Sequence, residues 1–211
     1  TQNQALSAIL FLYQKVLEQK LDWLHDVVRA KRPRRLPVVL TQAEVISLLE
    51  EIHGINGLIA RLLYGTGMRQ MECLRLRVKD IDFHYRQIHV RSGKGDKDRI
   101  TILPDRLVHD IQVQLKQALQ LHQRDLHQGF GETRLPYALS RKYLDAGREW
   151  GWQFVFPSKC RSADPYCGTM RRHHWHHTNL HRAIKQAARN INLAKPVSSH
   201  ILRHTFATHL L

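Results

Sequence analysis

A histidine and an arginine three residues apart, His200 and Arg203, are the starting point for the chemistry of this sequence. Pro196 ends the segment before them and Ser198 or Ser199 can cap a helix, so both side chains are expected on one helical face. An imidazole can accept or donate a proton, and a planar guanidinium can bind two oxygens of one phosphate. The pair alone also fits an ordinary helix start, so its interpretation depends on partners elsewhere in the chain.

A second arginine, Arg69, falls in the first turn of a helix predicted directly after Gly65 and Gly67. The glycines permit a tight turn against a phosphate or against another helix. Free N–H groups and the positive dipole end of a helix favour an anion, and an arginine there strengthens such a site. Glu72, three residues on, can hold the guanidinium in place, although a surface Arg–Glu pair would contribute little.

A lysine, Lys94, stands between two glycines in the turn that joins residues 86–91 to residues 98–103. Both segments alternate between polar and apolar residues, which predicts a β-hairpin with the lysine at its tip. An ammonium group there can donate a proton to a leaving oxygen, contact a phosphate or simply be solvated.

The charge balance indicates a polyanionic partner. Lysine and arginine number 33 against 18 aspartates and glutamates, so the formal net charge is +15. This excess is larger than solubility requires and favours nucleic acid. A hydrophobic fraction of 43% supports a packed core in one large domain or two small ones.

Other classes of protein are disfavoured by the cysteines and by the hydropathy pattern. The chain has 3 cysteines, an odd number without a paired framework, which suits a reducing cytosol. It shows no signal peptide and no apolar stretch long enough to span a bilayer, so no membrane partner is expected. It lacks an initiator methionine and stops after an apolar pair, and we therefore expect a piece of a longer protein.

Apolar residues at helical spacing predict the elements that carry these groups. Helices are expected over residues 5–28, 41–52, 58–64, 68–74, 107–127, 175–191 and 198–211, with a short helical patch over 137–144. A capping box, Thr41 to Glu44, opens the second helix. The inward residues are expected to be Ile111, Leu115, Leu119 and Leu126 in the long helix, and Ile201, Phe206 and Leu210 in the last.

Two further segments leave alternatives open. Residues 29–40 are predicted to form an extended basic linker, whose cations suit either a nucleic-acid backbone or plain solvation. Trp150 and Trp152 can stack on unpaired bases or belong to the core. Cys160 and Cys167 precede a run of histidines whose spacing matches no usual zinc site, so no metal is expected.

Three motifs, in this order, resemble the tyrosine recombinase (phage integrase) family: TGMRQME at 66–72, GKGDKDR at 93–99 and HILRHTFATHLL at 200–211. The resemblance covers residues 36–211. It implies an α+β, mainly α-helical, catalytic domain with a small antiparallel β-sheet or hairpin. It also implies that residues 1–30 hold the last helix of an N-terminal core-binding domain, that 31–40 form the linker, and that 41–211 form a catalytic domain incomplete at its C-terminus.

The same resemblance implies roles for individual residues. Arg69 and Arg203 would grip the scissile phosphate, Lys94 would protonate the leaving 5′ oxygen and His200 would assist proton transfer, while Glu72 would orient Arg69. A covalent intermediate conserves the bond energy, so neither a cofactor nor a metal is expected. Further DNA contacts are expected from a set of basic residues: Arg32, Arg34, Arg35, Lys97 and Arg99.

A segment at residues 128–177 is similar to the insertion particular to integron integrases, which recombine gene cassettes. The similarity is carried by Leu135-Pro136, Arg141-Lys142-Tyr143, Trp150, Phe156-Pro157-Ser158 and Arg171-Arg172-His173-His174. It implies double-stranded attachment sites and folded single-stranded cassette sites as DNA partners. Extrahelical bases of the folded sites would be contacted by Pro136, Trp152, His173 and His174, because a base already out of the stack costs little to capture.

The family's nucleophilic tyrosine lies well beyond the His-x-x-Arg helix, and none of the 6 tyrosines here occupies that place. The resemblance therefore implies that this chain binds DNA but does not cleave it. It further implies a bacterial cytoplasmic protein that is a homotetramer on DNA when full-length, whereas this chain is a monomer. The alternative is a non-catalytic DNA-binding or regulatory module that retains the phosphate clamp. A metal-dependent nuclease is disfavoured because the motifs contain no carboxylate cluster.

Overall fold

The computed structural model describes residues 2–19, 38–91, 97–136, 139–143 and 145–211, apart from the side chains of residues 140 and 141. Two compact units are distinguished, Thr1–Leu36 and Pro37–Leu211. Each is considered by itself. The predicted linker arginines, Arg32, Arg34 and Arg35, lie outside the described residues, as does Lys94.

The described part of the first unit is a single helical stretch. The α-helix α1 (Gln2–Phe11) continues as a π-helix, η1 (Leu12–Val16), and Glu18 then has a positive φ of 52°. The prediction of one α-helix over residues 5–28 is therefore wrong in this part, because the helix begins earlier and ends near residue 17. No residue of α1 is buried, and helix stability in proteins comes mainly from packing of an apolar face.

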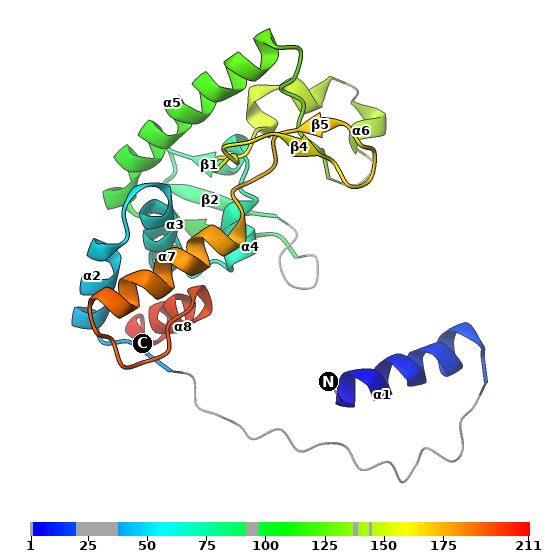
Figure 1. The fold of residues 1–211 in the computed structure, drawn as a ribbon. Helices are drawn as coiled ribbons and strands as arrows, with labels where there is room; N and C mark the ends of the chain where they lie inside the picture. Colours follow the sequence, from blue (N-terminus) through cyan, green and yellow to red (C-terminus); the bar gives the residue numbers. More distant parts are fainter. Residues whose placement is uncertain (1, 20–37, 92–96, 137–138, 144) are drawn as a thin grey trace. The chain divides into compact units, whose positions relative to one another are not determined.

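The second unit is mainly helical, with a small antiparallel sheet, which confirms the predicted fold class (Figure 1). Its longer helices are α2 (Gln42–Glu51), α3 (Gly54–Thr66), α5 (Asp105–His127), α7 (His177–Asn190) and α8 (Ser199–His209). Short helical segments are α4 (Gln70–Leu74), α6 (Leu139–Lys142) and the 3-10 turns η3 (Val78–Asp80), η4 (Ala146–Arg148) and η5 (Trp150–Trp152). Among the described helices, none is both long and apolar enough to cross a membrane.

The main sheet has the strand order β1-β2-β3 and is antiparallel throughout. Its strands are β1 (Ile81–Asp82), β2 (Gln87–Val90) and β3 (Arg99–Ile102). The predicted hairpin is confirmed, with Val90 opposite Arg99 at the end nearest the tip. A second small hairpin pairs β4 (Ser162–Ala163) with β5 (Met170–Arg171).

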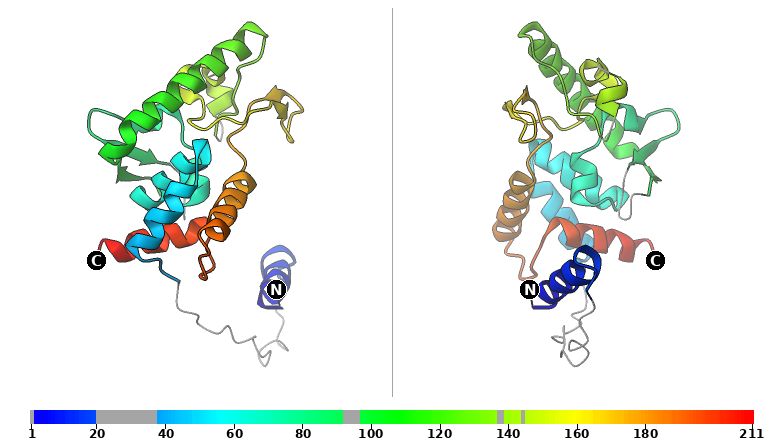
Figure 2. Two further views of the ribbon diagram at one scale, coloured as in Figure 1. Left: turned by 60° about the vertical axis from the view of Figure 1, so that its left-hand side comes forward. Right: turned by 90° about the vertical axis from the view of Figure 1, so that its right-hand side faces the viewer.

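The core of the second unit is centred on α3, against which α2, α5, α7 and α8 pack (Figures 1 and 2). Ile59, Leu62 and Leu63 of α3 are fully buried. The predicted capping box at the start of α2 is confirmed: Glu44 N–H donates to Thr41 Oγ1 (3.2 Å) and Thr41 N–H donates to Glu44 Oε2 (2.7 Å). Local sequence signals and long-range burial therefore agree in this part of the fold.

The long helix α5 differs from its prediction near its C-terminus. Leu126 is 38% exposed, whereas His122 and Asp125 face inward. Both make polar contacts with the following segment: Asp125 accepts from Arg172 at both carboxylate oxygens, and a ring nitrogen of His122 lies 3.0 Å from the Arg148 carbonyl oxygen. Apolar periodicity missed this face because polar partners, rather than apolar ones, cover it.

The last two helices also differ from their predictions, in buried face or in first residue. Leu210, just after the end of α8, is 71% exposed, whereas Leu202 and Thr205 of α8 are buried. Thr205 Oγ1 accepts a hydrogen bond from the Leu40 N–H (3.2 Å), so this face of α8 contacts the segment at the start of the second unit. Helix α7 begins at His177 and not at Trp175, because the Trp175 backbone N–H donates to the Phe156 carbonyl oxygen (2.6 Å) and His176 caps the helix. The Trp175 ring is buried, and its Nε1 donates to Asn56 Oδ1 (2.9 Å).

Candidate active site

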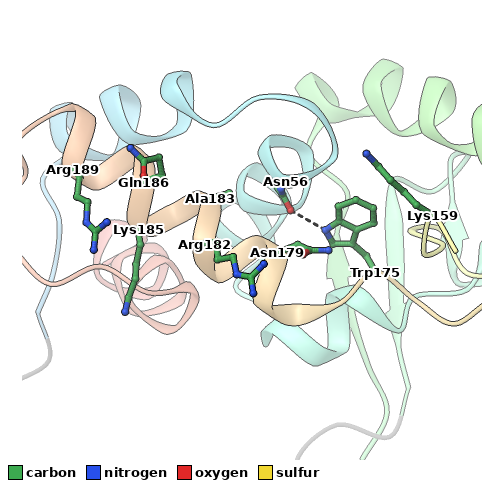
Figure 3. Close-up of a pocket in the computed structure, with 9 residues that line it drawn as sticks. All are labelled: Asn56, Lys159, Trp175, Asn179, Arg182, Ala183, Lys185, Gln186 and Arg189. Carbon is green, nitrogen blue, oxygen red and sulfur yellow. Dashed lines mark hydrogen bonds between the residues drawn. The ribbon is translucent and has the colours of Figure 1, made fainter. Parts of the chain in front are cut away.

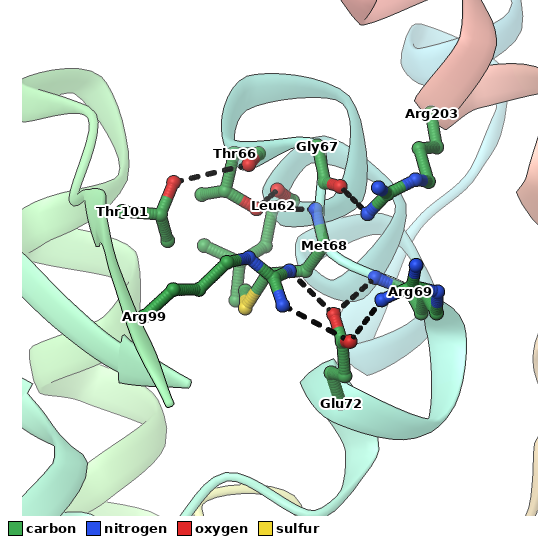
Figure 4. A network of polar contacts seen from close by, with 9 residues as sticks. All are labelled: Leu62, Thr66, Gly67, Met68, Arg69, Glu72, Arg99, Thr101 and Arg203. Carbon is green, nitrogen blue, oxygen red and sulfur yellow. Dashed lines mark hydrogen bonds and ion pairs between the residues drawn. The ribbon is translucent and has the colours of Figure 1, made fainter. Parts of the chain in front are cut away.

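The candidate site begins at the turn after α3. Gly67 ends that helix with a φ of +60°, the left-handed conformation that glycine adopts without strain. A Cβ atom at Gly67 would lie 2.5 Å from Cδ1 of Phe206 on α8. Of the two partners expected for this turn, it is another helix that packs against it. Arg203 Nη1 from that same helix donates to the Gly67 carbonyl oxygen (Figure 4).

Arg69 lies at the first position before α4 and is held by Glu72. Its Nη1 donates to Glu72 Oε1 (2.7 Å), and its backbone N–H donates to Glu72 Oε2 (2.8 Å). The Glu72 side chain is 8% exposed. This Arg69–Glu72 pair is therefore not a solvated surface pair, and it fixes the guanidinium at the end of the turn.

A second guanidinium shares the same carboxylate. Arg99, the first residue of β3, donates from Nη2 to Glu72 Oε2 (2.5 Å) and from Nη1 to Oε1 (3.1 Å). Burial alone would raise the pKa of Glu72, but the hydrogen bonds from Arg99 and Arg69 outweigh it and lower the pKa to about 2. The carboxylate is thus ionised at every physiological pH.

His200 and Arg203 lie on the same helix as predicted, in the first turns of α8. Loss of solvation lowers the pKa of His200, and so do the neighbouring charges of His204, Arg203 and Arg69. Burial, followed by the charge of Arg69, lowers the pKa of Arg203. The positive charge of Arg69 thus acts on both His200 and Arg203, an electrostatic environment that favours a bound anion.

One residue that sequence reasoning missed joins the helices of the site. Gln70 Nε2 donates to the His177 carbonyl oxygen of α7 (3.0 Å), and its Oε1 accepts from Ser199 Oγ at the start of α8 (2.9 Å). Glutamine at the first position of a short helix carries no distinctive sequence signal. Its partners lie more than a hundred residues away along the chain.

The sequence profile of the phage integrase family matches residues 38–211, which is most of the chain. The chain belongs to the phage integrase family. The predicted family resemblance is thereby confirmed.

Relatives within the family are longer than this chain. An integrase/recombinase from Escherichia coli is 47% identical over 211 residues, which are 100% of this chain and 63% of the relative. The tyrosine recombinase XerD from Mycobacterium tuberculosis is 31% identical and is matched over 99% of this chain and 60% of its own length. A crystal structure of the XerH site-specific recombinase bound to difH substrate has the same fold, with a TM-score of 0.57, 20% identity and coverage of 96% of this chain and 51% of XerH.

The residues predicted to contact extrahelical bases lie near or within the segment between α5 and α7. Most of them are partly buried. Trp152 is half-buried, with Lys79 Nζ 2.8 Å from its ring centroid. His174 meets the Phe154 ring edge-on at 5.5 Å, and burial lowers its pKa. His173 Nε2 is buried without a hydrogen-bond partner, and Pro136 is exposed.

The remaining predicted site residues are placed as follows. Lys97 is exposed, and Lys94 belongs to the residues that the structure does not describe. Cys160 and Cys167 are both exposed free thiols. Within the described ranges, no group of three or more histidine, cysteine or acidic side chains is placed to hold a metal ion.

A basic groove of about 820 Å³ runs along α7 (Figure 3). Its lining includes Lys159, Arg182, Lys185 and Arg189, together with Asn56 and Trp175, and the described lining residues include no carboxylate. The Trp175–Asn56 hydrogen bond forms part of its wall. An uncompensated row of cations beside a groove is typical of a surface that binds a nucleic-acid backbone.

Proposed function

We propose that this chain is the catalytic part of a site-specific recombinase, which in its full-length form breaks and rejoins DNA strands through a covalent 3′-phosphotyrosyl intermediate. The observation that supports the proposal is the anchoring of Arg69 and Arg203 beside one turn, with His200 three residues before Arg203 on α8. Glu72 and the Gly67 carbonyl oxygen hold the two guanidiniums in place before any substrate binds. Fixed cations stabilise the transition state most strongly when they lie where negative charge develops during the reaction.

The proposed reaction uses these groups in a defined order. A tyrosine oxygen attacks the scissile phosphorus, and the bond from phosphorus to the 5′ oxygen breaks. Arg69 and Arg203 would bind the non-bridging oxygens, whose charge increases in the pentacoordinate state. Burial and the neighbouring positive charges lower the pKa of His200, which favours the neutral imidazole that can take the tyrosine proton. Lys94 would return a proton to the 5′ oxygen, as the family resemblance implies.

The nucleophile is expected from outside residues 1–211, because none of the 6 tyrosines follows the His200–Arg203 helix. We therefore propose that this chain alone binds DNA without cleaving it. The direct test is a suicide substrate, a DNA site nicked so that the cleaved end diffuses away, offered to the full-length protein and to residues 1–211. A covalent adduct on the full-length protein alone supports the proposal.

We further propose that the DNA substrates are gene cassettes, recombined by a homotetramer on double-stranded and folded single-stranded sites. The support is the similarity of residues 128–177 to the integron insertion and the position of Trp152 within it. Lys79 Nζ lies 2.8 Å from the centroid of the half-buried Trp152 ring, and we propose that an extrahelical base stacks on the exposed part of this ring. A cation beside the ring also suits the phosphate that follows such a base.

Trp152→Ala is expected to weaken binding to a bulged hairpin about tenfold and binding to perfect duplex much less, because one stacked base contributes about 1–3 kcal/mol. Fluorescence anisotropy with both DNAs at one salt concentration measures this difference. Trp150→Ala is the matched control, since that ring already stacks on His122, with centroids 6.0 Å apart. Equal losses on both DNAs would contradict a base contact by Trp152.

Replacing groove cations is expected to weaken DNA binding without changing sequence preference. Arg182→Gln and Lys185→Gln should each lower affinity for all sequences alike and reduce the slope of log affinity against log salt by about one. Titrations at several salt concentrations measure the slope, with Lys116→Gln on the exposed side of α5 as the control. A slope that both groove variants leave unchanged would remove this groove from the DNA interface.

A further inference from the structure

The carboxylate of Glu72 is fully occupied by two arginines from different parts of the fold. Oε1 accepts from Nη1 of Arg69 and Nη1 of Arg99, and Oε2 accepts from the Arg69 backbone N–H and Nη2 of Arg99. Both oxygens therefore receive two donors. A buried carboxylate with its acceptor sites filled in this way has one stable orientation, since any rotation would break charge-assisted hydrogen bonds.

Arg99 approaches this carboxylate from the sheet. It is 27 residues from Glu72 in the sequence and begins β3, opposite Val90. Two residues further along the same strand, Thr101 Oγ1 donates to the Thr66 carbonyl oxygen (3.1 Å). Strand β3 thus contacts Glu72 of α4 and Thr66 at the end of α3, and Figure 4 shows both contacts.

Arg99, which is expected to contact DNA, donates two hydrogen bonds from its guanidinium to Glu72. Hydrogen bonding to Glu72 raises the pKa of Arg99, so the pair stays ionised. One negative charge shared by two guanidiniums leaves a net positive charge at the turn. Arg69 then depends on Arg99 for a geometric reason: without Arg99, Oε1 and Oε2 each lose a donor, and only the two hydrogen bonds from Arg69 itself orient the Glu72 carboxylate.

We propose that Arg99 is a positioning residue for the recombination reaction, acting through Glu72 to hold the guanidinium of Arg69 in its place for the scissile phosphate. The inference rests on the proposed function, because it concerns DNA cleavage. A small misplacement of a catalytic group costs much more in rate than in binding. The loss of Arg99 is therefore a loss of cleavage rate in the bound complex, with DNA affinity largely kept.

The test compares Arg99→Gln, Arg99→Lys and the control Arg86→Gln in the full-length protein, with thermal unfolding to establish that each is folded. Arg86 forms an exposed pair with Asp105 at the opposite end of the same hairpin. At saturating protein, Arg99→Gln should cleave about 10- to 100-fold more slowly, with DNA affinity within about threefold and an unchanged salt slope. Arg99→Lys, which keeps a charge and a donor, should be intermediate, and Arg86→Gln should match the unsubstituted protein.

A double substitution separates action through Arg69 from an independent effect. If Arg99 acts through Arg69, combining Arg99→Gln with Arg69→Lys should slow cleavage scarcely more than Arg69→Lys alone, because effects on one shared network are not additive. If the two substitutions instead reduce the cleavage rate by the product of their separate factors, the inference is overturned. So would a salt slope lowered by about one in Arg99→Gln together with unchanged cleavage of the bound complex, which would make Arg99 a direct phosphate contact.

A readout that needs no cleavage distinguishes this inference from the proposed function. In ¹⁵N spectra of the full-length protein, the Arg69 Nε–H signal, assigned by its loss in Arg69→Lys, should shift and exchange faster with solvent in Arg99→Gln but not in Arg86→Gln. An unaltered signal overturns the inference, whatever the activity. An altered signal in a protein that forms no adduct with DNA upholds the positioning of Arg69 and refutes the recombinase proposal.

Discussion

Arg69→Ala in the full-length protein is expected to slow DNA cleavage about 10³-fold while weakening DNA binding by less than about tenfold. The reason is that a fixed guanidinium stabilises the charge of the transition state far more than that of the bound phosphate diester. Single-turnover cleavage at saturating protein gives the rate, and a separate titration on uncleaved DNA gives the affinity. The two measurements must be made at one salt concentration, because DNA affinity depends steeply on salt.

The same variant separates a recombinase from a non-catalytic DNA-binding module. In a module that uses Arg69 only to hold a phosphate, affinity should fall with a salt slope smaller by about one, and there would be no cleavage to lose. Arg61→Ala is the matched control. Its guanidinium lies 3.5 Å from Asp110 in an exposed pair on α3 and α5, and neither cleavage nor binding should change.

Gly67→Ala is expected to destabilise the second unit by about 2–5 kcal/mol. An alanine in the left-handed conformation costs about 1–2 kcal/mol, and overpacking in a filled interior costs about 1–3 kcal/mol more. The second cost arises because the added Cβ atom would lie 2.5 Å from the Phe206 ring. The clash also pushes apart the turn and α8, so cleavage should fall along with stability. Urea unfolding measures the free energy of unfolding.

Gly54→Ala supplies the control for the Gly67 prediction. Gly54 has the same φ of +60°, yet nothing lies within 4 Å of a Cβ atom built there. Its substitution should therefore carry the conformational cost alone, about 1–2 kcal/mol. If Gly67→Ala destabilises no more than Gly54→Ala, the turn does not pack tightly against α8. If it destabilises more, adding Phe206→Ala should recover part of the difference.

The parts of the fold that could be predicted from sequence are those set by neighbours along the chain. The capping box at Thr41 depends on residues three apart, and the hairpin of β2 and β3 depends on alternation within each strand. The predictions were wrong where residues distant in the sequence determine which side chains are buried. Leu126 is exposed because polar partners cover the inward face of α5, and the helix predicted over residues 5–28 lacks a buried face in its described part.

The same distinction holds within the site. The Arg69–Glu72 pair was predictable because three residues span one helical turn. The contact of Arg203 with the Gly67 carbonyl oxygen spans 136 residues, and only the family resemblance brought the two motifs together. Nothing in the sequence paired Arg99 with Glu72, since a basic residue next to a glycine-rich turn favours a DNA contact equally well. In the structure, Arg69 and Arg99 both bind the buried carboxylate of Glu72.

The suicide-substrate experiment tests the central claim most directly, with a DNA site selected from random sequence by its binding to the full-length protein. The account predicts a covalent protein–DNA adduct for the full-length protein, its loss in Arg69→Ala and Arg203→Ala, and none with residues 1–211 although these still bind the site. An adduct formed by residues 1–211, or full-strength adduct formation without either arginine, would contradict it.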